Sequence, residues 1–379
     1  MIITIEDTES LIHILKNVVG VTEVKQTMPV LSNVLIRVDS TGMHFSATDL
    51  EVQVQNTYNP GRSEEQIETT LPAKKLLDII QALSSNKKIT LHIESEKTTI
   101  SAGKSELVLP ALSANDFPLM KPISENRDES EYSQMSGEAL SQGLTETSFC
   151  MAYQDARHYL NGLYFEKGDG KTTFVSTDGH RLALTSINST NSANQTDSCI
   201  VPRKCINELK RILASFKDIS KKIITFNYNS KQIEFNIEGH AVTSKLIEGK
   251  FPEYKKVFPE ELPNKLTLNK AEFKQHLSVM SQVANEKYKG VKLTINNKEL
   301  LLSSTNSEQN QGKGKTAIPC EYQGEPMEIG FNLSYLLETI DVIPTQSVLI
   351  QISNSDGGCL ITASDNDSNN KYIIMPMRV

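Results

Sequence analysis

Asp178 and His180 are the residues of this 379-residue chain whose types and spacing best suit acid–base or metal chemistry. A working site of that kind needs more groups, such as a second histidine four positions away for a metal or a G-x-S-x-G turn for a nucleophile. The sequence places no such group beside the pair. Polar residues next to a glycine are also typical of a turn whose side chains bind backbone groups. We therefore favour a structural turn, and keep a hydrolase that uses Asp178 and His180 as an alternative.

Two other motifs resemble ligand-binding loops but depart from them at required positions. Residues 314–316 (Gly-Lys-Thr) resemble the end of a phosphate-binding loop, but Gln309 stands where the pattern requires glycine. Asp365, Asp367 and Asn369 have the spacing of a calcium loop, but its glycine and its closing glutamate are missing. The cysteines form no C-x-x-C pair, which favours a reducing compartment. They are Cys150, Cys199, Cys205, Cys320 and Cys359. The sequence predicts no catalytic residue, no metal site and no cofactor.

The turn around Gly179 lies between two alternating apolar runs, a pattern that predicts two strands joined by a tight turn. Residues 45–52 and 301–306 repeat this pattern. Thr48, Thr177 and Thr305, which mark the three turns, are about 129 and about 128 positions apart. This regularity predicts an internal repeat.

The repeat extends to the elements around each turn. Helical spacing predicts the first helix of each copy through Leu11 and Leu15, through Leu140 and Leu144, and through Phe273, Leu277 and Met280. Strands are predicted at 31–38, 42–48, 50–58, 88–94, 98–101, 107–112, 160–165, 171–177, 290–295, 300–304, 348–353 and 371–379, and second helices at 76–83 and 333–340. Three copies of helix, strands, helix, strands indicate an α+β fold. We predict domains at 1–123, 130–250 and 253–379, with a polar linker at 124–133.

Composition excludes several classes of protein. A hydrophobic content of 38% with 22% charged residues is ordinary for a globular protein. No apolar run is long enough to cross a bilayer and the N-terminus is acidic, so we expect a cytoplasmic protein without a membrane partner. The formal charge of -7 argues against coating nucleic acid by bulk attraction, although an acidic body can carry a basic face. The lack of tryptophan argues against binding single strands by base stacking.

Several basic residues occupy equivalent positions in the copies. Most lysines and arginines are solvated surface, but in a ring of repeats equivalent charges would face one central hole. The residues concerned are Lys16, Lys25, Lys74, Lys75, Arg203, Lys204, Lys210, Arg211, Lys287 and Lys289.

Six ordered segments resemble the bacterial sliding clamp family, the beta subunit of DNA polymerase III, and the similarity covers the whole chain. They are 154–162 (QDARHYLNG), 177–182 (TDGHRL), 201–204 (VPRK), 249–254 (GKFPEY), 285–290 (NEKYKG) and 375–378 (MPMR). The resemblance implies three clamp-type domains, each with antiparallel sheets outside and two helices inside. Two protomers would close head to tail into a ring around duplex DNA. Such a homodimer is a non-catalytic processivity factor that tethers DNA polymerase III, other polymerases and the clamp loader.

The resemblance also implies which residues make each contact. Duplex DNA would face Lys25, Gln154, His158, Tyr159, Arg203 and Lys204. Partner peptides would dock in an apolar cleft built from Leu160, Thr177, Gly179, His180, Arg181, Leu182, Pro252, Lys256, Val257, Tyr288, Asn332, Tyr335, Ile373, Ile374, Met375, Pro376, Met377, Arg378 and Val379. The dimer interface would include Leu107, Leu109 and Val283.

The chain departs from well-studied family members at four of these positions. Lys256 replaces an arginine and so lacks the planar fork that binds carboxylates. Tyr288 replaces phenylalanine, Leu107 replaces an aromatic residue, and Val379 shortens the last side chain. These changes bear on partner preference and on the strength of ring closure. A repeat-built scaffold that binds only proteins stays as a second alternative.

Overall fold

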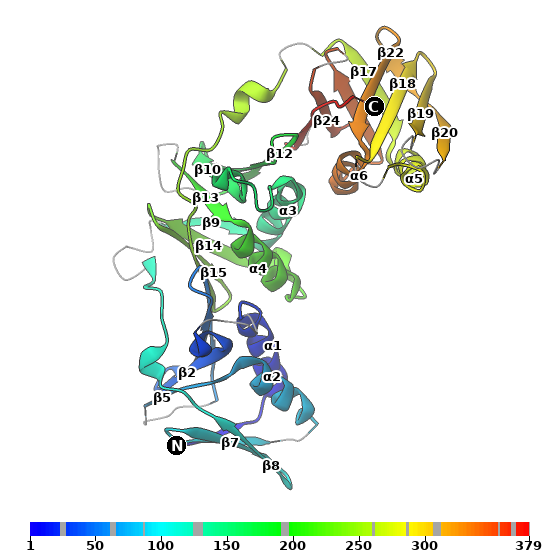
Figure 1. Ribbon diagram of the computed structural model, residues 1–379. Helices are drawn as coiled ribbons and strands as arrows, with labels where there is room; N and C mark the ends of the chain where they lie inside the picture. The colour runs from blue at the N-terminus through cyan, green and yellow to red at the C-terminus, as the bar shows by residue number, and fades with distance from the viewer. Residues whose placement is uncertain are drawn as a thin grey trace. The chain divides into compact units, whose positions relative to one another are not determined.

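The computed structural model describes residues 1–22, 28–60, 66–85, 88–123, 132–190, 197–259, 262–285, 288–305, 312–354, 357–364 and 369–378. The chain falls into two units, drawn in Figure 1 in the colours of the sequence. Unit 1 comprises Met1–Ser141, Ser189–Asn194 and Lys204–Leu246. Unit 2 comprises Gln142–Asn188, Gln195–Arg203 and Ile247–Val379.

The described part of unit 1 contains two antiparallel sheets. One has the order β5-β2-β3-β4-β16-β15-β14-β9 and the other has the order β1-β6-β7-β8. The strands are β1 (Ile2–Ile5), β2 (Asn33–Asp39), β3 (Gly42–Thr48), β4 (Val52–Tyr58), β5 (Ile67–Pro72), β6 (Ile89–Ile93), β7 (Lys97–Ala102), β8 (Ser105–Pro110), β9 (Ser133–Ser136), β14 (Ile223–Tyr228), β15 (Gln232–Ile237) and β16 (His240–Lys245). The larger sheet joins strands that lie almost two hundred positions apart, because β4 pairs with β16 through Val54 and Val242.

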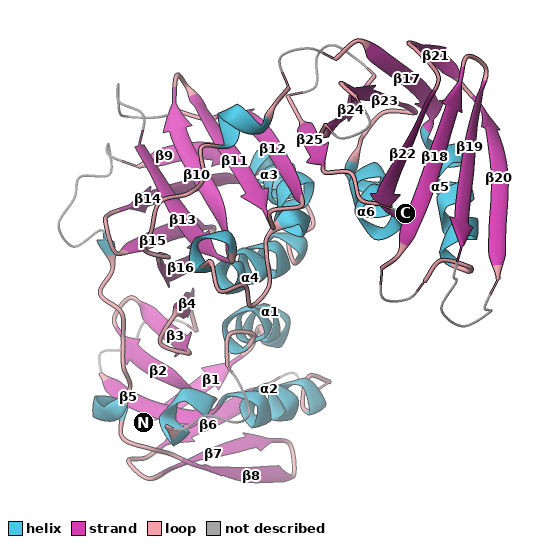
Figure 2. Ribbon diagram, turned by 45° about the horizontal axis from the view of Figure 1, so that its top comes forward, coloured by secondary structure: helices cyan, strands magenta, loops and turns pink. Residues whose placement is uncertain are grey.

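Helices α1 (Thr8–Val19) and α2 (Ala73–Ala82) pack against each other in unit 1, and α1 also contacts β3 and β4 (Figure 2). The helix α1 starts after Asp7, whose carboxylate accepts a hydrogen bond from the Ser10 amide at 3.0 Å. Leu11, Leu15 and Val18 then face the core at helical spacing. The sequence therefore both starts this helix and decides which side is buried.

Two further helices come from the middle of the chain. The helix α3 (Gly137–Thr147) begins in unit 1 and ends in unit 2, and α4 (Arg203–Ala214) lies in unit 1 apart from its first residue. Ile206, Leu209 and Leu213 form the buried side of α4.

Unit 2 also contains two antiparallel sheets within its described residues. Their orders are β13-β10-β11-β12-β25-β24-β23-β17-β21 and β20-β19-β18-β22. The strands are β10 (Gly162–Gly168), β11 (Lys171–Thr177), β12 (Arg181–Asn188), β13 (Asp197–Pro202), β17 (Asn264–Asn269), β18 (Gly290–Asn296), β19 (Glu299–Thr305), β20 (Lys313–Pro319), β21 (Glu321–Gln323), β22 (Met327–Asn332), β23 (Ser347–Ile352), β24 (Cys359–Ala363) and β25 (Lys371–Ile374). The last strand, β25, pairs with β12, which carries the chain end to the turn around Gly179.

Helices α5 (Lys270–Ser281) and α6 (Leu333–Val342) cover one face of these sheets and contact each other (Figure 2). Each begins after an asparagine whose side-chain oxygen accepts backbone N–H groups, Asn269 for α5 and Asn332 for α6. Phe273 and Leu336 are among the buried residues between helices and sheets.

Most predicted elements agree with the structure, and the differences are at their ends. The strand predicted at 31–38 begins at Asn33, because Pro29 favours the short 3-10 helix η1 (Pro29–Ser32) before it. The strand predicted at 371–379 ends at Ile374, since Pro376 has no N–H to donate to a sheet. The third turn is not described beyond Thr305, and Asp365 and Asp367 also lie outside the described residues. The predicted domain limits stay a prediction.

No helix in the described ranges combines the length and the apolar character needed to cross a membrane.

Candidate functional site: a cleft beside the turn at Gly179

The turn Thr177–Arg181 joins β11 to β12 and is held by its own side chains. The Thr177 hydroxyl donates to the Arg181 carbonyl at 2.6 Å and accepts from the Gly179 amide at 3.1 Å. Oδ1 of Asp178 accepts from the amides of His180 and Arg181 at 2.9 and 3.0 Å. Gly179 has φ +90°, a conformation that glycine adopts without strain. The sequence therefore specifies a rigid turn.

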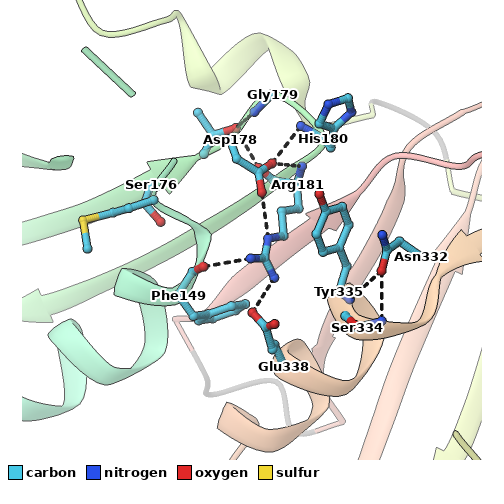
Figure 3. A network of polar contacts seen from close by, with 12 residues as sticks. Phe149, Ser176, Asp178, Gly179, His180, Arg181, Asn332, Ser334, Tyr335 and Glu338 are labelled. Atoms are coloured by element: carbon cyan, nitrogen blue, oxygen red, sulfur yellow. Dashed lines mark hydrogen bonds and ion pairs between the residues drawn. The ribbon is translucent and has the colours of Figure 1, made fainter. Parts of the chain in front are cut away.

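The Arg181 guanidinium connects this turn to two other segments (Figure 3). Its Nε donates to Oδ2 of Asp178 at 3.0 Å, its Nη1 to Glu338 of α6 at 2.8 Å, and its Nη2 to the Phe149 carbonyl at 2.9 Å. The group also lies 4.3 Å from the centre of the Tyr335 ring, a cation–π contact. Arg181 is only 9% exposed. A buried arginine with this many partners fixes the turn relative to α6.

A cavity of about 310 Å³ opens beside the turn. Most of its lining side chains are apolar. The lining comes from residues 157–160, from the turn, from the ends of β12 and β25, and from the segment 251–258. The lining residues are Arg157, Tyr159, Leu160, Thr177, Gly179, Arg181, Leu182, Pro252, Tyr254, Val257, Ile373 and Met375. Nine of the predicted cleft residues are among them. We call this cavity the cleft.

The chain end forms one side of the cleft. The Met375 amide donates to the His180 carbonyl at 2.8 Å, and the Met377 amide donates to the Gly330 carbonyl at 2.9 Å. Met375 is 42% exposed and Val257 is equally exposed across the cleft. Exposed apolar side chains on a backbone that is held in place can contact a ligand with little loss of backbone entropy.

A second cavity, of about 600 Å³, is lined by three predicted cleft residues, His180, Arg181 and Tyr335. Arg181 lines both cavities, and the second one is polar because Asp155, Asp178 and Glu338 line it together with Arg181 and Arg203. The turn therefore separates an apolar cavity from a polar one.

The remaining predicted cleft residues lie elsewhere. Ile374 is 0% exposed in the core beneath the helices, so its prediction as a cleft residue is wrong. The physical reason is strand alternation, because its neighbour Ile373 takes the cleft face. Asn332 caps α6, and Lys256 forms an exposed ion pair with Glu253. The residues Tyr288, Pro376, Met377 and Arg378 do not line the cleft, and Val379 lies outside the described residues.

Three lining residues were absent from the predicted cleft set. Tyr159 was predicted to face DNA but lines the cleft, and Arg157 and Tyr254 were not assigned. Arg157 and Tyr159 precede Leu160 by three positions and by one, and Tyr254 follows Pro252 by two positions. Proximity in sequence to predicted cleft residues was the available signal.

The other predicted DNA-facing residues have different surroundings. Gln154 and His158 are exposed, and the Arg203 guanidinium lies 5.7 Å from the centre of the Tyr153 ring. Lys204 forms an ion pair with Asp49 in unit 1. Lys25 lies outside the described residues.

The predicted interface residues lie on or near sheet edges. The strand β8 ends its sheet and exposes Leu107 and Val108, at 37% and 55%. Leu109 is buried at 4% in unit 1, so its side chain cannot belong to an exposed surface, and Val108 takes that place. In unit 2, Val283 packs near the edge strand β20, where a Cβ on Gly314 would lie 2.5 Å from Cγ2 of Val283.

The geometry does not favour the acid–base, phosphate-binding or metal chemistry that the sequence motifs raised. Both carboxylate oxygens accept hydrogen bonds from the turn or from Arg181, which leaves the group poorly placed to exchange protons with a substrate. Residues 314–316 lie in the strand β20 instead of at a strand-to-helix loop, so they are not a phosphate-binding loop. Among the described residues, no three His, Cys, Asp or Glu side chains gather as metal ligands would.

Repeated helix-and-sheet copies with an apolar cleft at the end of the chain define a protein of the clamp class. The family model of the DNA polymerase III beta subunit, N-terminal domain, matches residues 1–121. The models of the central and C-terminal domains of the same subunit match residues 134–253 and 255–378.

Complete relatives agree with this assignment. The chain is 36% identical to the beta sliding clamp of Pseudomonas aeruginosa and 34% identical to that of Pseudomonas putida, over 98% of both chains in each case. A crystal structure of the Pseudomonas aeruginosa DNA polymerase III subunit beta matches with a TM-score of 0.93 and 35% identity over 100% of both chains. The chain belongs to the family of bacterial DNA polymerase III beta subunits, the beta sliding clamps. Proteins of this family are non-catalytic processivity factors built from three clamp domains.

Proposed function

We propose that this chain forms a head-to-tail homodimeric ring around duplex DNA and tethers DNA polymerase III, other polymerases and the clamp loader through peptides docked in the cleft. The observation that carries the proposal is the cleft itself, an apolar cavity of about 310 Å³ beside a rigid turn. A processivity factor needs such a docking site and no catalytic group. The protein acts in the cytoplasm, where bacterial DNA lies.

The apolar lining sets the strength of docking. Leu160, Leu182, Val257 and Met375 offer surfaces on which about four peptide side chains can be buried, for roughly 6–12 kcal/mol gross. Association costs reduce this gain, so binding of roughly micromolar strength is expected. Methionine adapts its shape to different ligands, which suits exchange between partners.

The second cavity and the chain end extend the docking site. His180, Tyr335, Asn332, Tyr288, Lys256, Pro376, Met377, Arg378 and Val379 stay in the proposal as contacts for the ends of a docked peptide. His180 and Tyr335 have support from their place in the cavity that shares Arg181 with the cleft.

Edge strands support the proposed dimer. The strand β8 offers Leu107 and Val108 with the exposed acid Glu106, and β20 offers the exposed bases Lys313 and Lys315. An unpaired sheet edge can pair with another strand, and opposite charges favour one register. We propose that β8 of one protomer pairs with β20 of its partner, with Val283 behind that edge.

Proposed DNA contacts are Lys25, Gln154, His158, Tyr159, Arg203 and Lys204. The exposed positions of Gln154 and His158 support this set, whereas the ion pair of Lys204 with Asp49 assigns that lysine a structural role as well. Nonspecific phosphate contacts are weak and sensitive to salt, so the topology of a ring would have to supply retention. We also propose domain limits of 1–123, 130–250 and 253–379, which the family matches support to within a few residues.

Retention on DNA of different topology tests the ring. We expect the loaded protein to remain on closed circular duplex during gel filtration at high salt and to be lost when the circle is cut once. Only a topological link depends on free ends. A protein scaffold without a ring would behave identically on both DNAs, and that result would overturn the proposal.

Removing residues 375–379 tests the docking site. We expect the truncated chain to lose binding of a labelled polymerase docking peptide, measured by fluorescence anisotropy, and to keep its dimer mass in sedimentation. Met375→Ala should weaken binding by about tenfold, because it removes much of one side of the cleft. The matched control is Met28→Ala, because Met28, at 41% exposed, is about as exposed as Met375 but lies in unit 1 and does not line the cleft. Unchanged affinity in the truncated chain would remove the tail from the site.

A further inference from the structure

A third cavity, which we call the depression, lies on the same face of the unit 2 sheet as the cleft. Its volume is about 400 Å³ and Tyr254 lines both cavities. The other lining residues are Glu166, Thr173, Leu184, Ser186, Lys255, Phe258 and Lys371. The segment 251–258 therefore has the cleft on one side and this depression on the other.

The segment 251–258 is held firmly enough to keep both cavities in shape. The Phe251 ring stacks on Tyr164 of β10 with centres 4.7 Å apart, and Phe251 and Tyr254 are 6% and 5% exposed. The Tyr254 hydroxyl donates to Oε1 of Glu166 at 3.2 Å. Burial and Glu166 raise the pKa of Tyr254, so the phenol keeps the proton that it donates.

The depression has an excess of positive charge. Glu166 already accepts hydrogen bonds from Tyr254 and from Lys255, whose Nζ lies 3.1 Å from Oε1. The second lysine, Lys371, is exposed and lies with its Nζ 5.8 Å from the centre of the Phe258 ring. Two lysines and one carboxylate leave a surplus of one positive charge.

The floor offers further groups for an acidic side chain. Thr173 and Ser186 face each other across β11 and β12, and their hydroxyls form a hydrogen bond at 2.9 Å. One of these hydroxyls donates in that bond, so the other has a proton left to donate. Leu184 and Phe258 supply apolar surface for an aliphatic stem.

We propose that this depression binds an acidic residue, preferably glutamate, that flanks the docked segment in partner peptides. The glutamate stem would lie on Leu184 and Phe258, and its carboxylate would face Lys371, Lys255 and the hydroxyl pair. This inference rests on the proposed docking function of the cleft.

Sheet geometry sets the spacing. Thr177 lines the cleft and Thr173 lines the depression, four positions apart on the same strand. At about 3.3 Å per residue this is about 13 Å, which an extended peptide covers with about four residues. The flanking acid therefore belongs about four residues beyond the last side chain docked in the cleft.

Binding of matched peptides tests the inference. The probes are fluorescein-labelled peptides that share one polymerase docking segment and carry a five-residue extension at either end, with glutamate or glutamine at the fourth residue from the docking segment. We expect the glutamate extension to tighten binding about two- to fivefold at one end only, as exposed ion pairs do. Added salt should reduce this gain. Lys371→Gln should abolish it, and the matched control Lys265→Gln, an exposed lysine of β17 in the same sheet, should preserve it.

The possible results separate this inference from the docking proposal. Equal affinity of glutamate and glutamine peptides at both ends would overturn the inference and leave docking in the cleft intact. A gain that survives Lys371→Gln would also overturn it, because the charge would then act elsewhere. Failure of every peptide to bind would overturn the docking proposal and this inference together.

Discussion

The turn Thr48–Val52 in unit 1 and the turn Thr177–Arg181 in unit 2 have the same hydrogen bonds. Thr48 donates to the Val52 carbonyl and accepts from the Leu50 amide, as Thr177 does with Arg181 and Gly179. Asp49 accepts from two amides, as Asp178 does. The same local sequence pattern has therefore produced the same local structure twice.

The neighbours of the two turns differ. In unit 2, Thr177 pairs with Leu182, which pairs with Ile373, and the row is mostly apolar. In unit 1, the equivalent row is Thr48, Gln53 and Thr243.

Gln53 occupies in unit 1 the register position that Leu182 occupies in unit 2. Its amide exchanges two hydrogen bonds with the Met120 backbone, at 2.8 and 3.3 Å, and the residue is 0% exposed. Leu182 makes no such bond to segment 251–258 and lines a cavity instead. The same register position therefore holds a polar side chain bonded to the backbone in unit 1 and an apolar side chain that lines the cleft in unit 2.

Replacing the cation that pairs with the aspartate of each turn, Arg181 with Asp178 and Lys204 with Asp49, should give the largest difference in stability between the two turns. We expect Arg181→Met to lower the free energy of unfolding by about 3–5 kcal/mol, because it leaves Asp178 and the Phe149 carbonyl without their buried donor. Lys204→Met should cost about 1–2 kcal/mol, since Lys204 is 33% exposed and water can reach its place. Urea denaturation followed by circular dichroism measures both. Equal losses would show that the two cations do equivalent work.

Acid should affect unit 1 through His240, which is 3% exposed in β16 next to the strand of the first turn. Burial, and then the nearby His13, lower its pKa to about 4, so the folded state keeps it neutral. The unfolded chain binds a proton near pH 6.5, so this stabilisation is complete above that pH and is lost as the pH falls towards about 4. The loss is roughly 3 kcal/mol.

The pH dependence of thermal unfolding measures this effect. His240→Phe should flatten the stability curve between pH 6.5 and 4, because phenylalanine has no proton to gain. The exposed His92 supplies the control variant His92→Phe. A curve for His240→Phe that keeps its full slope would assign the acid sensitivity to other groups.

Exchanging the residues at the register position should give an intermediate effect. Leu182→Gln should weaken binding of a docking peptide about tenfold by placing an amide in the apolar cleft. Gln53→Leu should cost about 1–3 kcal/mol of stability, since the Met120 amide and carbonyl lose their partners. Anisotropy and urea denaturation measure the two outcomes. The comparison fails if Gln53→Leu alters peptide affinity as much as Leu182→Gln does.

Substitutions at the tips of the two turns should have the smallest effect on stability. Leu50 has φ +77° and Gly179 has φ +90°, so only the second turn has the residue that suits this conformation. Leu50→Gly should raise stability by up to about 1 kcal/mol, and Gly179→Ala should lower it by about the same amount. The new Cβ at position 179 would also lie 3.0 Å from the Arg157 guanidinium in the cleft. Thermal unfolding of the two variants measures both changes. Melting-temperature shifts of the same sign would contradict the prediction.

Alternation and caps made much of the fold predictable. The helix starts at Asp7, Asn269 and Asn332 and the paired strands around Gly179 follow from patterns within a few residues. The same alternation separates Ile373 from Ile374, a distinction that the predicted cleft set did not use. It also separates Val108 from Leu109 on β8.

The sequence by itself determined the repeated elements and the turn that opens at Gly179, because periodicity, capping and turn chemistry act over short distances along the chain. Only the tertiary structure decided what lies around that turn. Glu338 reaches Arg181 from 157 positions away, and segment 251–258 and the chain end complete the cleft. Such contacts depend on how sheets and helices pack together, which no local pattern specifies, and they form the cleft beside the turn at Gly179.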